Sequence, residues 1–147
     1  MPKVSEIMSR EVASLESKDT AASAAKKMVE GGFGCLLVTR KGSVVGIVTE
    51  RDLVRKVLAK NEDPNKIKLE DIMSQPVITI GPSMQVGDAS KLMSEKRIRR
   101  LPVIDDDLLV GIVTTTDIAR YLARSKNYLD PLINALARQE PEEGPYR

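Results

Sequence analysis

The chain has 147 residues, which suits one domain or two small, closely packed halves, and its 41% hydrophobic and 30% charged residues are typical of a globular protein. Its 23 basic and 21 acidic residues nearly balance, which argues against a general nucleic-acid or membrane binder. No apolar run approaches the ~20 residues that a membrane-spanning helix needs, and the N-terminus lacks the apolar core of a signal peptide. We therefore expect a cytoplasmic protein.

The sequence offers few groups for catalysis or metal binding. It has no histidine and a single cysteine, Cys35, which excludes an intrachain disulfide and a multi-thiolate metal site. Cys35 lies in an apolar run and is predicted to be a buried, inert thiol. The run Asp105-Asp106-Asp107 has no partner acid at coordination spacing and is predicted to be a hairpin turn. We expect no catalytic residues, no metal site and no enzyme activity.

A long internal repeat organises the chain. Residues 65 positions apart match without a gap over about fifty residues. Ile7-Met8-Ser9 recurs as Ile72-Met73-Ser74, and Val45-Gly46-Ile47-Val48-Thr49 recurs as Val110-Gly111-Ile112-Val113-Thr114. Chance similarity does not hold one register over this length, so the sequence predicts a tandem duplication.

Each repeat predicts the order strand, helix, strand, strand, helix. The first strands are expected around residues 12–15 and 77–80. Apolar residues at spacings of three and four then predict helices with one buried face, carried by Ala21, Ala24, Ala25 and Met28 and by Val86, Ala89, Leu92 and Met93. Two apolar strands around a polar turn form a hairpin in each repeat, at residues 36–48 and 101–113. The second helices begin near Glu50 and Thr115.

These patterns predict a first repeat at residues 1–61, a polar linker at 62–66 and a second repeat at 67–124. Residues 125–147 are predicted to form a C-terminal helix and a tail. Asp130 and Pro131 suit an N-cap and a first helical residue. The apolar stripe Leu129, Leu132, Ile133 and Leu136 would close over its own domain or pack on a neighbour.

The repeated element order resembles the cystathionine-beta-synthase-type (CBS) domain pair, or Bateman module, over residues 3–124. The motifs that carry the resemblance are Ile-Met-Ser before the first strand, Arg99-Arg100-Leu101-Pro102-Val103, and Gly-Ile-Val-Thr-x-x-Asp in both copies. It implies an α/β (α+β) fold in a stand-alone pair, with repeats related by a pseudo-two-fold axis, sheets packed together and helices outside. In the family, the two clefts between the repeats commonly hold AMP, ADP, ATP or, less often, S-adenosylmethionine.

The end of the Gly-Ile-Val-Thr-x-x-Asp motif is suited to nucleotide binding. Free N–H groups and the positive end of a helix dipole are expected where the strand ends and the helix begins. Thr49 can offer its hydroxyl to a phosphate, and Asp52 can accept hydrogen bonds from both ribose hydroxyls. Thr114 and Asp117 repeat the pattern. The same residues also come close to a capping box, which stabilises a helix without any ligand.

The two predicted sites differ in their basic residues. The family resemblance implies that Arg97, Arg99 and Arg100 reach the cleft whose Thr and Asp come from the other repeat, and guanidinium groups suit phosphate oxygens. The better site is therefore predicted from Thr49, Asp52, Val77, Ile78, Arg97, Arg99, Arg100 and Pro102, with adenine near Val77 and Ile78. A second, weaker site is predicted from Val12, Ala13, Thr114 and Asp117, because Gly34 and Cys35 stand where arginines would be. Alternatively, the basic cluster is a solvated helix end.

The resemblance implies a regulatory module that binds an adenine nucleotide and signals to a partner protein, and that forms a homodimer through its helices. The alternatives are a structural dimerisation module without a ligand, an S-adenosylmethionine-binding regulator and a nucleic-acid-binding regulator. The last is disfavoured because aromatic residues, on which bases could stack, make up 3% of the chain.

Overall fold

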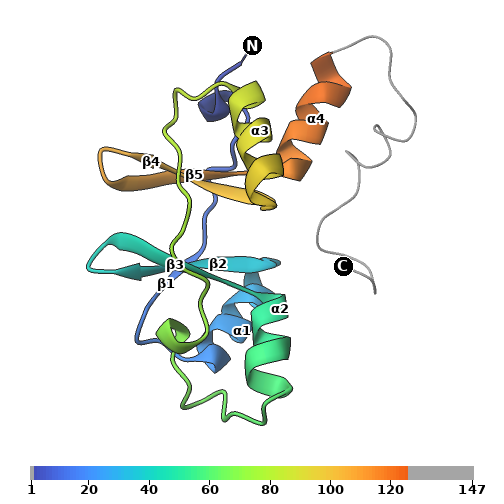
Figure 1. Ribbon diagram of the computed structural model, residues 1–147. Helices are drawn as coiled ribbons and strands as arrows, with labels where there is room; N and C mark the ends of the chain where they lie inside the picture. The colour runs from blue at the N-terminus through green and yellow to red at the C-terminus, as the bar shows by residue number, and fades with distance from the viewer. Residues whose placement is uncertain (1, 126–147) are drawn as a thin grey trace. The chain divides into compact units, whose positions relative to one another are not determined.

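The computed structural model describes residues 2–125, which form two compact units (Figure 1). One is the continuous unit, Val12–Val77. The other is the split unit, which combines the residues before Val12 with those from Ile78 onward. Each unit therefore contains most of one repeat together with the first residues of the other repeat. The chain passes between the units at residues 11–12 and 77–78, whereas the predicted linker, residues 62–66, lies inside the continuous unit.

The continuous unit is a three-stranded sheet with helices on one side (Figure 1). Strand β1 (Ser14–Glu16) runs parallel to β2 (Cys35–Arg40), which pairs antiparallel with β3 (Ser43–Thr49). Helix α1 (Ala21–Gly31) buries the predicted Ala21, Ala24 and Met28 against this sheet. Helix α2 (Glu50–Leu53) continues into a π-helical segment, η2 (Val54–Leu58). Thr20 caps α1, as its hydroxyl accepts a hydrogen bond from the N–H of Ser23 at 3.2 Å.

The split unit repeats this plan around the antiparallel hairpin of β4 (Arg100–Asp105) and β5 (Leu108–Thr114). Helix α3 (Val86–Lys96) precedes the hairpin and α4 (Thr115–Ser125) follows it (Figure 1). Its separate core includes Ile80, Leu101, Val103 and Val113. The hairpin turn predicted at the three aspartates is confirmed, with Asp106 and Asp107 at φ of 47° and 65°. The predicted C-terminal helix with Leu129, Asp130, Pro131, Leu132, Ile133 and Leu136 lies outside the described residues.

The strand predicted at residues 77–80 is wrong, because only Ile80 forms a bridge, parallel to Val103. The cause is Pro102, which occupies the position of Leu37 in the first repeat. The N–H of Leu37 donates to the carbonyl of Ala13 at 3.0 Å and extends the pairing of β1. Pro102 has no N–H, so the corresponding bond to Ile78 cannot form. The ladder is reduced to the two bonds made by Ile80, with Pro102 and Ile104.

A short segment from the start of each repeat completes the unit built on the other repeat. These leading segments are residues 2–9 in the split unit and 67–74 in the continuous unit, and each includes one 3-10 turn, η1 (Val4–Glu6) or η3 (Leu69–Asp71). Val4 and Leu69 are fully buried. Each segment also pairs with a strand, since Ser9 exchanges two hydrogen bonds of 2.9 Å with Ile112 and Ser74 pairs with Ile47 in the same way.

The methionine of each leading segment lies against the glycine of the Val-Gly-Ile-Val-Thr strand. A Cβ atom placed on Gly46 would lie 2.7 Å from Cγ and 2.9 Å from Cβ of Met73. A Cβ atom on Gly111 would lie 2.6 Å from Sδ of Met8 and 2.8 Å from the carbonyl oxygen of Ser9. Glycine is needed at both positions because the segment occupies the space of a side chain. The two most conspicuous repeated motifs are therefore the two sides of one contact.

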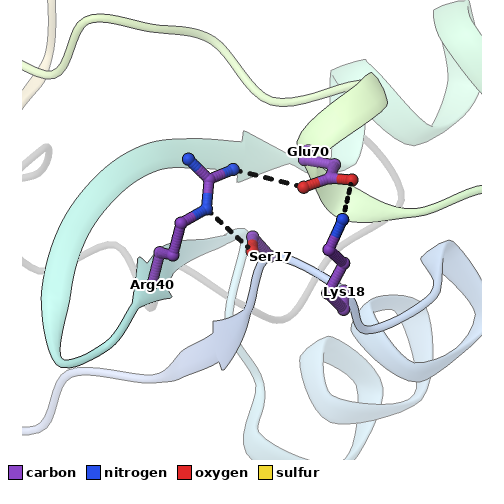
Figure 2. Close-up of polar contacts among 4 residues, drawn as sticks. All are labelled: Ser17, Lys18, Arg40 and Glu70. Atoms are coloured by element: carbon purple, nitrogen blue, oxygen red, sulfur yellow. Dashed lines mark hydrogen bonds and ion pairs between the residues drawn. The ribbon is translucent and has the colours of Figure 1, made fainter.

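Polar contacts hold the leading segment of the continuous unit, as Figure 2 shows. The Glu70 carboxylate pairs with Lys18 at 2.7 Å and with Arg40 at 3.2 Å, and Arg40 also donates to the hydroxyl of the buried Ser17 at 3.4 Å. The hydrogen bond from Lys18 and the charges of Lys18 and Arg40 lower the pKa of Glu70 below its ordinary value. The carboxylate thus connects η3 to the chain at the carboxyl ends of both β1 and β2, which lie side by side because the two strands are parallel.

We predict that Gly46→Ala destabilises the protein by about 1–3 kcal/mol, the usual cost of overpacking a filled core. Gly81→Ala is the matched control, since a Cβ atom there meets nothing within 4 Å. Denaturant unfolding would measure both. Combining Gly46→Ala with Met73→Ala should cost less than the sum of the single changes, because truncation removes Cγ and Sδ of Met73 and leaves only the contact with its Cβ. Additive costs would show that the glycine does not serve this contact.

Glu70→Gln should destabilise the protein at neutral pH and have progressively less effect in acid. Because the folded-state pKa of Glu70 is lowered, its contribution is fully present above the ordinary value of 4.5 and is lost as pH falls through the folded-state value. Urea unfolding of both proteins between pH 7 and pH 3 would show the two stabilities converging. Glu95→Gln is the control, since Glu95 lies 4.0 Å from Lys91 at an exposed site. A constant difference across the range would contradict the ion-pair assignment.

Candidate functional site

The Thr-x-x-Asp corner of the continuous unit lies where β3 ends and α2 begins. The hydroxyl of Thr49 accepts a hydrogen bond from the N–H of Asp52 at 3.2 Å. One oxygen of the Asp52 carboxylate, Oδ2, accepts the N–H of Thr49 at 2.9 Å and its hydroxyl at 3.2 Å. The corner is therefore a complete capping box. Asp52 is 9% exposed, so its carboxylate is held in one orientation.

The other oxygen of Asp52 faces a lysine that the sequence reading did not single out. Nζ of Lys56 lies 3.1 Å from Oδ1 of Asp52 and donates to the carbonyl of Ile72 at 2.8 Å. This ammonium thus joins the helix corner to the leading segment. The i,i+4 spacing of Asp52 and Lys56 was the available signal, but the contact with Ile72 links positions that only the fold brings together.

The split unit contains the same corner at the end of β5. Oδ2 of Asp117 accepts the N–H of Thr114 at 2.8 Å and its hydroxyl at 3.0 Å, while the N–H of Asp117 donates to the Thr114 hydroxyl at 3.2 Å. Nη1 of Arg120 lies 3.9 Å from Oδ1 of Asp117. The capping interpretation thus holds for both corners. It leaves room for a ligand, because a carboxylate has about four lone-pair positions.

The predicted arginines gather where α3 ends and β4 begins in the split unit. Arg97 and Arg99 are exposed and Arg100 is half-buried. None of the three forms an ion pair within residues 2–125, which leaves their guanidinium groups available to an anion. Arg100 lies directly opposite Thr114 across the β4–β5 pair, a neighbour that the sequence reading did not identify.

Arg97 adopts a backbone conformation that favours glycine. It is the C-cap of α3, with φ of 56° and ψ of 43°, and its counterpart in the first repeat is Gly32, with φ of 68° and ψ of 32°. A left-handed conformation is unfavourable for a residue with a Cβ atom. The arginine thus replaces the residue that this position favours.

The predicted adenine contacts differ between the two sites in one main-chain group. Val77 and Ile78 are half-buried, and no donor within the described residues bonds the Ile78 carbonyl, because Pro102 lacks the necessary N–H. At the second site Val12 is half-buried and Ala13 is buried, and the Ala13 carbonyl already accepts the N–H of Leu37. Within the described residues, a main-chain acceptor is thus left without a donor at Ile78 and not at Ala13.

Each predicted site draws residues from both units. Thr49, Asp52 and Val77 belong to the continuous unit, and Ile78, Arg97, Arg99, Arg100 and Pro102 belong to the split unit. Likewise Val12 and Ala13 belong to the continuous unit, and Thr114 and Asp117 to the split unit. The local geometry of each half is formed within its own unit, and the pairing of the halves stays a prediction.

The structure of residues 2–125 also bears on metal binding, membrane spanning and the burial of Cys35. No group of three or more His, Cys, Asp or Glu residues is placed to hold a metal ion. None of the helices in this part of the chain is both long enough and apolar enough to span a membrane. Cys35 is half-buried at the start of β2, rather than fully buried as predicted.

Comparison with known proteins identifies the family. The CBS domain model matches residues 4–59 and 69–124. The chain belongs to the CBS-domain family. A protein of Methanopyrus kandleri is 47% identical over 117 residues, which cover 78% of this chain and 60% of that protein. The CBS domain-containing protein YhcV of Bacillus subtilis is 34% identical over 119 residues, 81% of this chain and 84% of YhcV.

A solved structure of the family shows the same fold with ligands bound. The CBS domain pair of protein MJ0100, in complex with 5′-methylthioadenosine and S-adenosyl-L-methionine, is 33% identical, with a TM-score of 0.75 over 86% of this chain and 99% of that one. The α/β fold with two CBS repeats, predicted from the sequence, is thereby confirmed. Proteins of this kind are typically regulatory and non-catalytic.

Arg97→Gly should stabilise the CBS protein by about 0.5–1 kcal/mol, because glycine adopts the left-handed conformation without the Cβ penalty, partly offset by the entropy that it loses on folding. Thermal and urea unfolding would measure the gain. Lys96→Gly, one residue earlier inside α3, is the matched control and should destabilise by a similar amount. Loss of stability in Arg97→Gly would show that the arginine side chain, and not the backbone, governs this position.

Proposed function

We propose that this CBS pair is a regulatory module that binds AMP, ADP or ATP and signals the nucleotide to a partner protein. Support for the adenosine part comes from MJ0100, whose CBS pair binds two adenosyl compounds. Those compounds carry no phosphate. The observation that carries the nucleotide proposal is the group of three arginines, Arg97, Arg99 and Arg100, without a carboxylate partner in the described residues.

The proposed contacts follow from chemistry that each unit already presents. The Asp52 carboxylate would accept the ribose hydroxyls, and the Thr49 hydroxyl and the α2 N-terminus would face a phosphate. The adenine would lie against Val77, Ile78 and Pro102, where the open carbonyl of Ile78 can accept the exocyclic amino group. The guanidinium groups would pair with phosphate oxygens. The second site, with Val12, Ala13, Thr114 and Asp117, would bind more weakly because its main-chain acceptor is already used.

The arginine assignment predicts that the effect of mutation depends on ligand charge. Arg99→Gln combined with Arg100→Gln keeps hydrogen-bonding capacity and removes two charges. A charge pair at ~4 Å and an effective dielectric near 20 contributes about 4 kcal/mol before desolvation. Binding of AMP should therefore weaken about tenfold or more, with larger losses for ADP and ATP, while adenosine changes less than twofold. Calorimetric titration of all four ligands at one salt concentration measures the series.

A second arm of this experiment tests which corner the arginines serve. Asp52→Ala should weaken AMP binding by about 1.5–3 kcal/mol, and Asp117→Ala, which removes the same cap in the other unit, should cost less. The arginine changes should be non-additive with Asp52→Ala and additive with Asp117→Ala. The reverse pattern would assign Arg100 to its strand neighbour Thr114. Equal binding of all four ligands by parent and double mutant would contradict the phosphate role.

A structural dimerisation module is the second candidate function, and the same titration separates it from the first. Its support is an exposed apolar surface on the helices of the continuous unit. Val29 is 83% exposed, and Val54 and Leu58, one turn apart in η2, are 54% and 69% exposed. Burial of these side chains against a second copy would favour a homodimer that associates through the helices. Binding of none of the four ligands, together with a stable dimer in sedimentation analysis, would support this second candidate over the first.

A further inference from the structure

The two units present the same framework around the Thr-x-x-Asp corner. The leading segments have almost identical backbones: Lys3 and Lys68 have φ, ψ of −89°, 154° and −93°, 155°, and Ile7 and Ile72 have −122°, −12° and −123°, −13°. Both corners form the same three hydrogen bonds between threonine and aspartate. The carbonyl of Ile7 and Oδ1 of Asp117 are therefore the counterparts of the carbonyl of Ile72 and Oδ1 of Asp52.

One residue breaks this equivalence. In the continuous unit the ammonium group of Lys56 lies between the two acceptors, 2.8 Å from the Ile72 carbonyl and 3.1 Å from Oδ1 of Asp52. The position 65 residues later is Tyr121, which has no ammonium group. No donor bonds the Ile7 carbonyl within residues 2–125, and the cation that pairs with Oδ1 of Asp117 is Arg120, at the longer distance of 3.9 Å.

A cavity of about 470 Å³ opens at this place in the split unit. The described residues that line it are Glu6, Ile7, Asp117, Arg120, Tyr121 and Arg124. Two carboxylates thus come with two guanidinium groups, so the lining has no net charge but contains separate negative and positive groups. The tyrosine ring adds an apolar wall.

We propose that this cavity binds a small zwitterion with a primary ammonium group and a carboxylate, as in an amino acid. The ammonium occupies the position that Nζ of Lys56 has in the continuous unit, and donates to the Ile7 carbonyl and to Oδ1 of Asp117. Glu6 adds a second negative charge near it. The carboxylate pairs with Arg120 and Arg124, whose planar groups suit it. The cavity shares Asp117 with the second proposed nucleotide site, so the two ligands would compete there, but the inference rests on the split-unit lining alone and not on nucleotide binding.

Three probes of equal chain length separate the contributions of the two charges. Butylammonium matches the lysine side chain beyond Cα, butyrate carries only the carboxylate, and 4-aminobutanoate carries both groups. Ligand-observed NMR titrations without nucleotide, at low ionic strength, should show 4-aminobutanoate binding several-fold more tightly than butylammonium and at least tenfold more tightly than butyrate. Butyrate binding as tightly as 4-aminobutanoate would overturn the ammonium assignment.

Tyr121→Lys tests the position directly, because it restores the lysine of the first repeat. The new ammonium should bond to Asp117 and Ile7 and weaken 4-aminobutanoate binding at least tenfold. Leu122→Lys adds the same charge to the next residue of α4, which does not line the cavity, and should change binding less than twofold. Equal effects of the two substitutions would show that net charge, and not this position, governs binding, and would overturn the proposal.

The reciprocal change gives an independent readout in the continuous unit. Lys56→Met removes the ammonium from Asp52 and Ile72, so the variant should lose thermal stability, and butylammonium should restore part of the loss in a saturable manner. Butylammonium should shift the parent melting temperature less than that of Lys56→Met. Identical shifts in the two proteins would show that the paired acceptors do not select an ammonium group, which would also contradict the inference.

Discussion

The contact between each leading segment and the opposite repeat's glycine strand is the constraint on which both units depend. Met73 lies against Gly46 and Met8 against Gly111 so closely that no side chain larger than a hydrogen atom fits on the strand. The segments also bring Leu69 and Val4 into the two cores. Cutting the chain at the boundaries of the sequence repeats would therefore leave each core without one of its walls. The sequence is duplicated as two repeats, but each folding unit combines most of one repeat with the leading segment of the other.

The helix corners depend on the same segments. In the continuous unit Lys56 connects Asp52 to Ile72, so the carboxylate, the helix and the leading segment form one connected group. Glu70 holds the same segment from its other side through Lys18 and Arg40. The split unit has Tyr121, Ser5, Ser83 and Asp105 at the positions of Lys56, Glu70, Lys18 and Arg40. Its segment is held by backbone pairing and apolar burial without these ions, although the Asp117 side chain, at 13% exposed, is about as buried as that of Asp52, at 12%.

The two repeats build similar units, and the equivalent positions at which they differ include residues that packing alone does not explain. Pro102 in place of Leu37 costs a sheet hydrogen bond and frees the carbonyl of Ile78. Arg97 in place of Gly32 costs backbone energy and contributes a charge. Local disadvantages of this kind tend to occur where a protein has a function to serve. Both fall in the split unit, one at the end of α3 and the other in β4, among the residues of the better predicted site.

The sequence was sufficient for the features that depend on repetition and periodicity. The 65-residue offset follows from comparing the two repeats, and the buried stripes of α1 and α3 and the two hairpins follow from patterns within each repeat. The missing strand at residues 77–80 depends on a donor that Pro102 lacks, 22 residues beyond Ile80, which strand propensity does not register. Which residues form each unit depends on which segment of the chain fills the space beside Gly46 and Gly111. The Lys56 contact needs that same arrangement, so it could not be read from spacing alone.

The points where the chain passes between the units coincide with the predicted adenine contacts. The chain leaves the split unit at residues 11–12 and returns to it at residues 77–78, and Val12, Ala13, Val77 and Ile78 are the residues proposed to face the base. A ligand held there would touch the two covalent connections and at the same time bond Asp52 on one unit and arginines on the other. A ligand shifts a protein between two states only by the difference in its affinity for them. Because its charged contacts would lie on both units, that difference would be set mainly by the phosphates. Such a module would therefore distinguish nucleotides by their phosphate count, even though every one of them offers the same base and ribose.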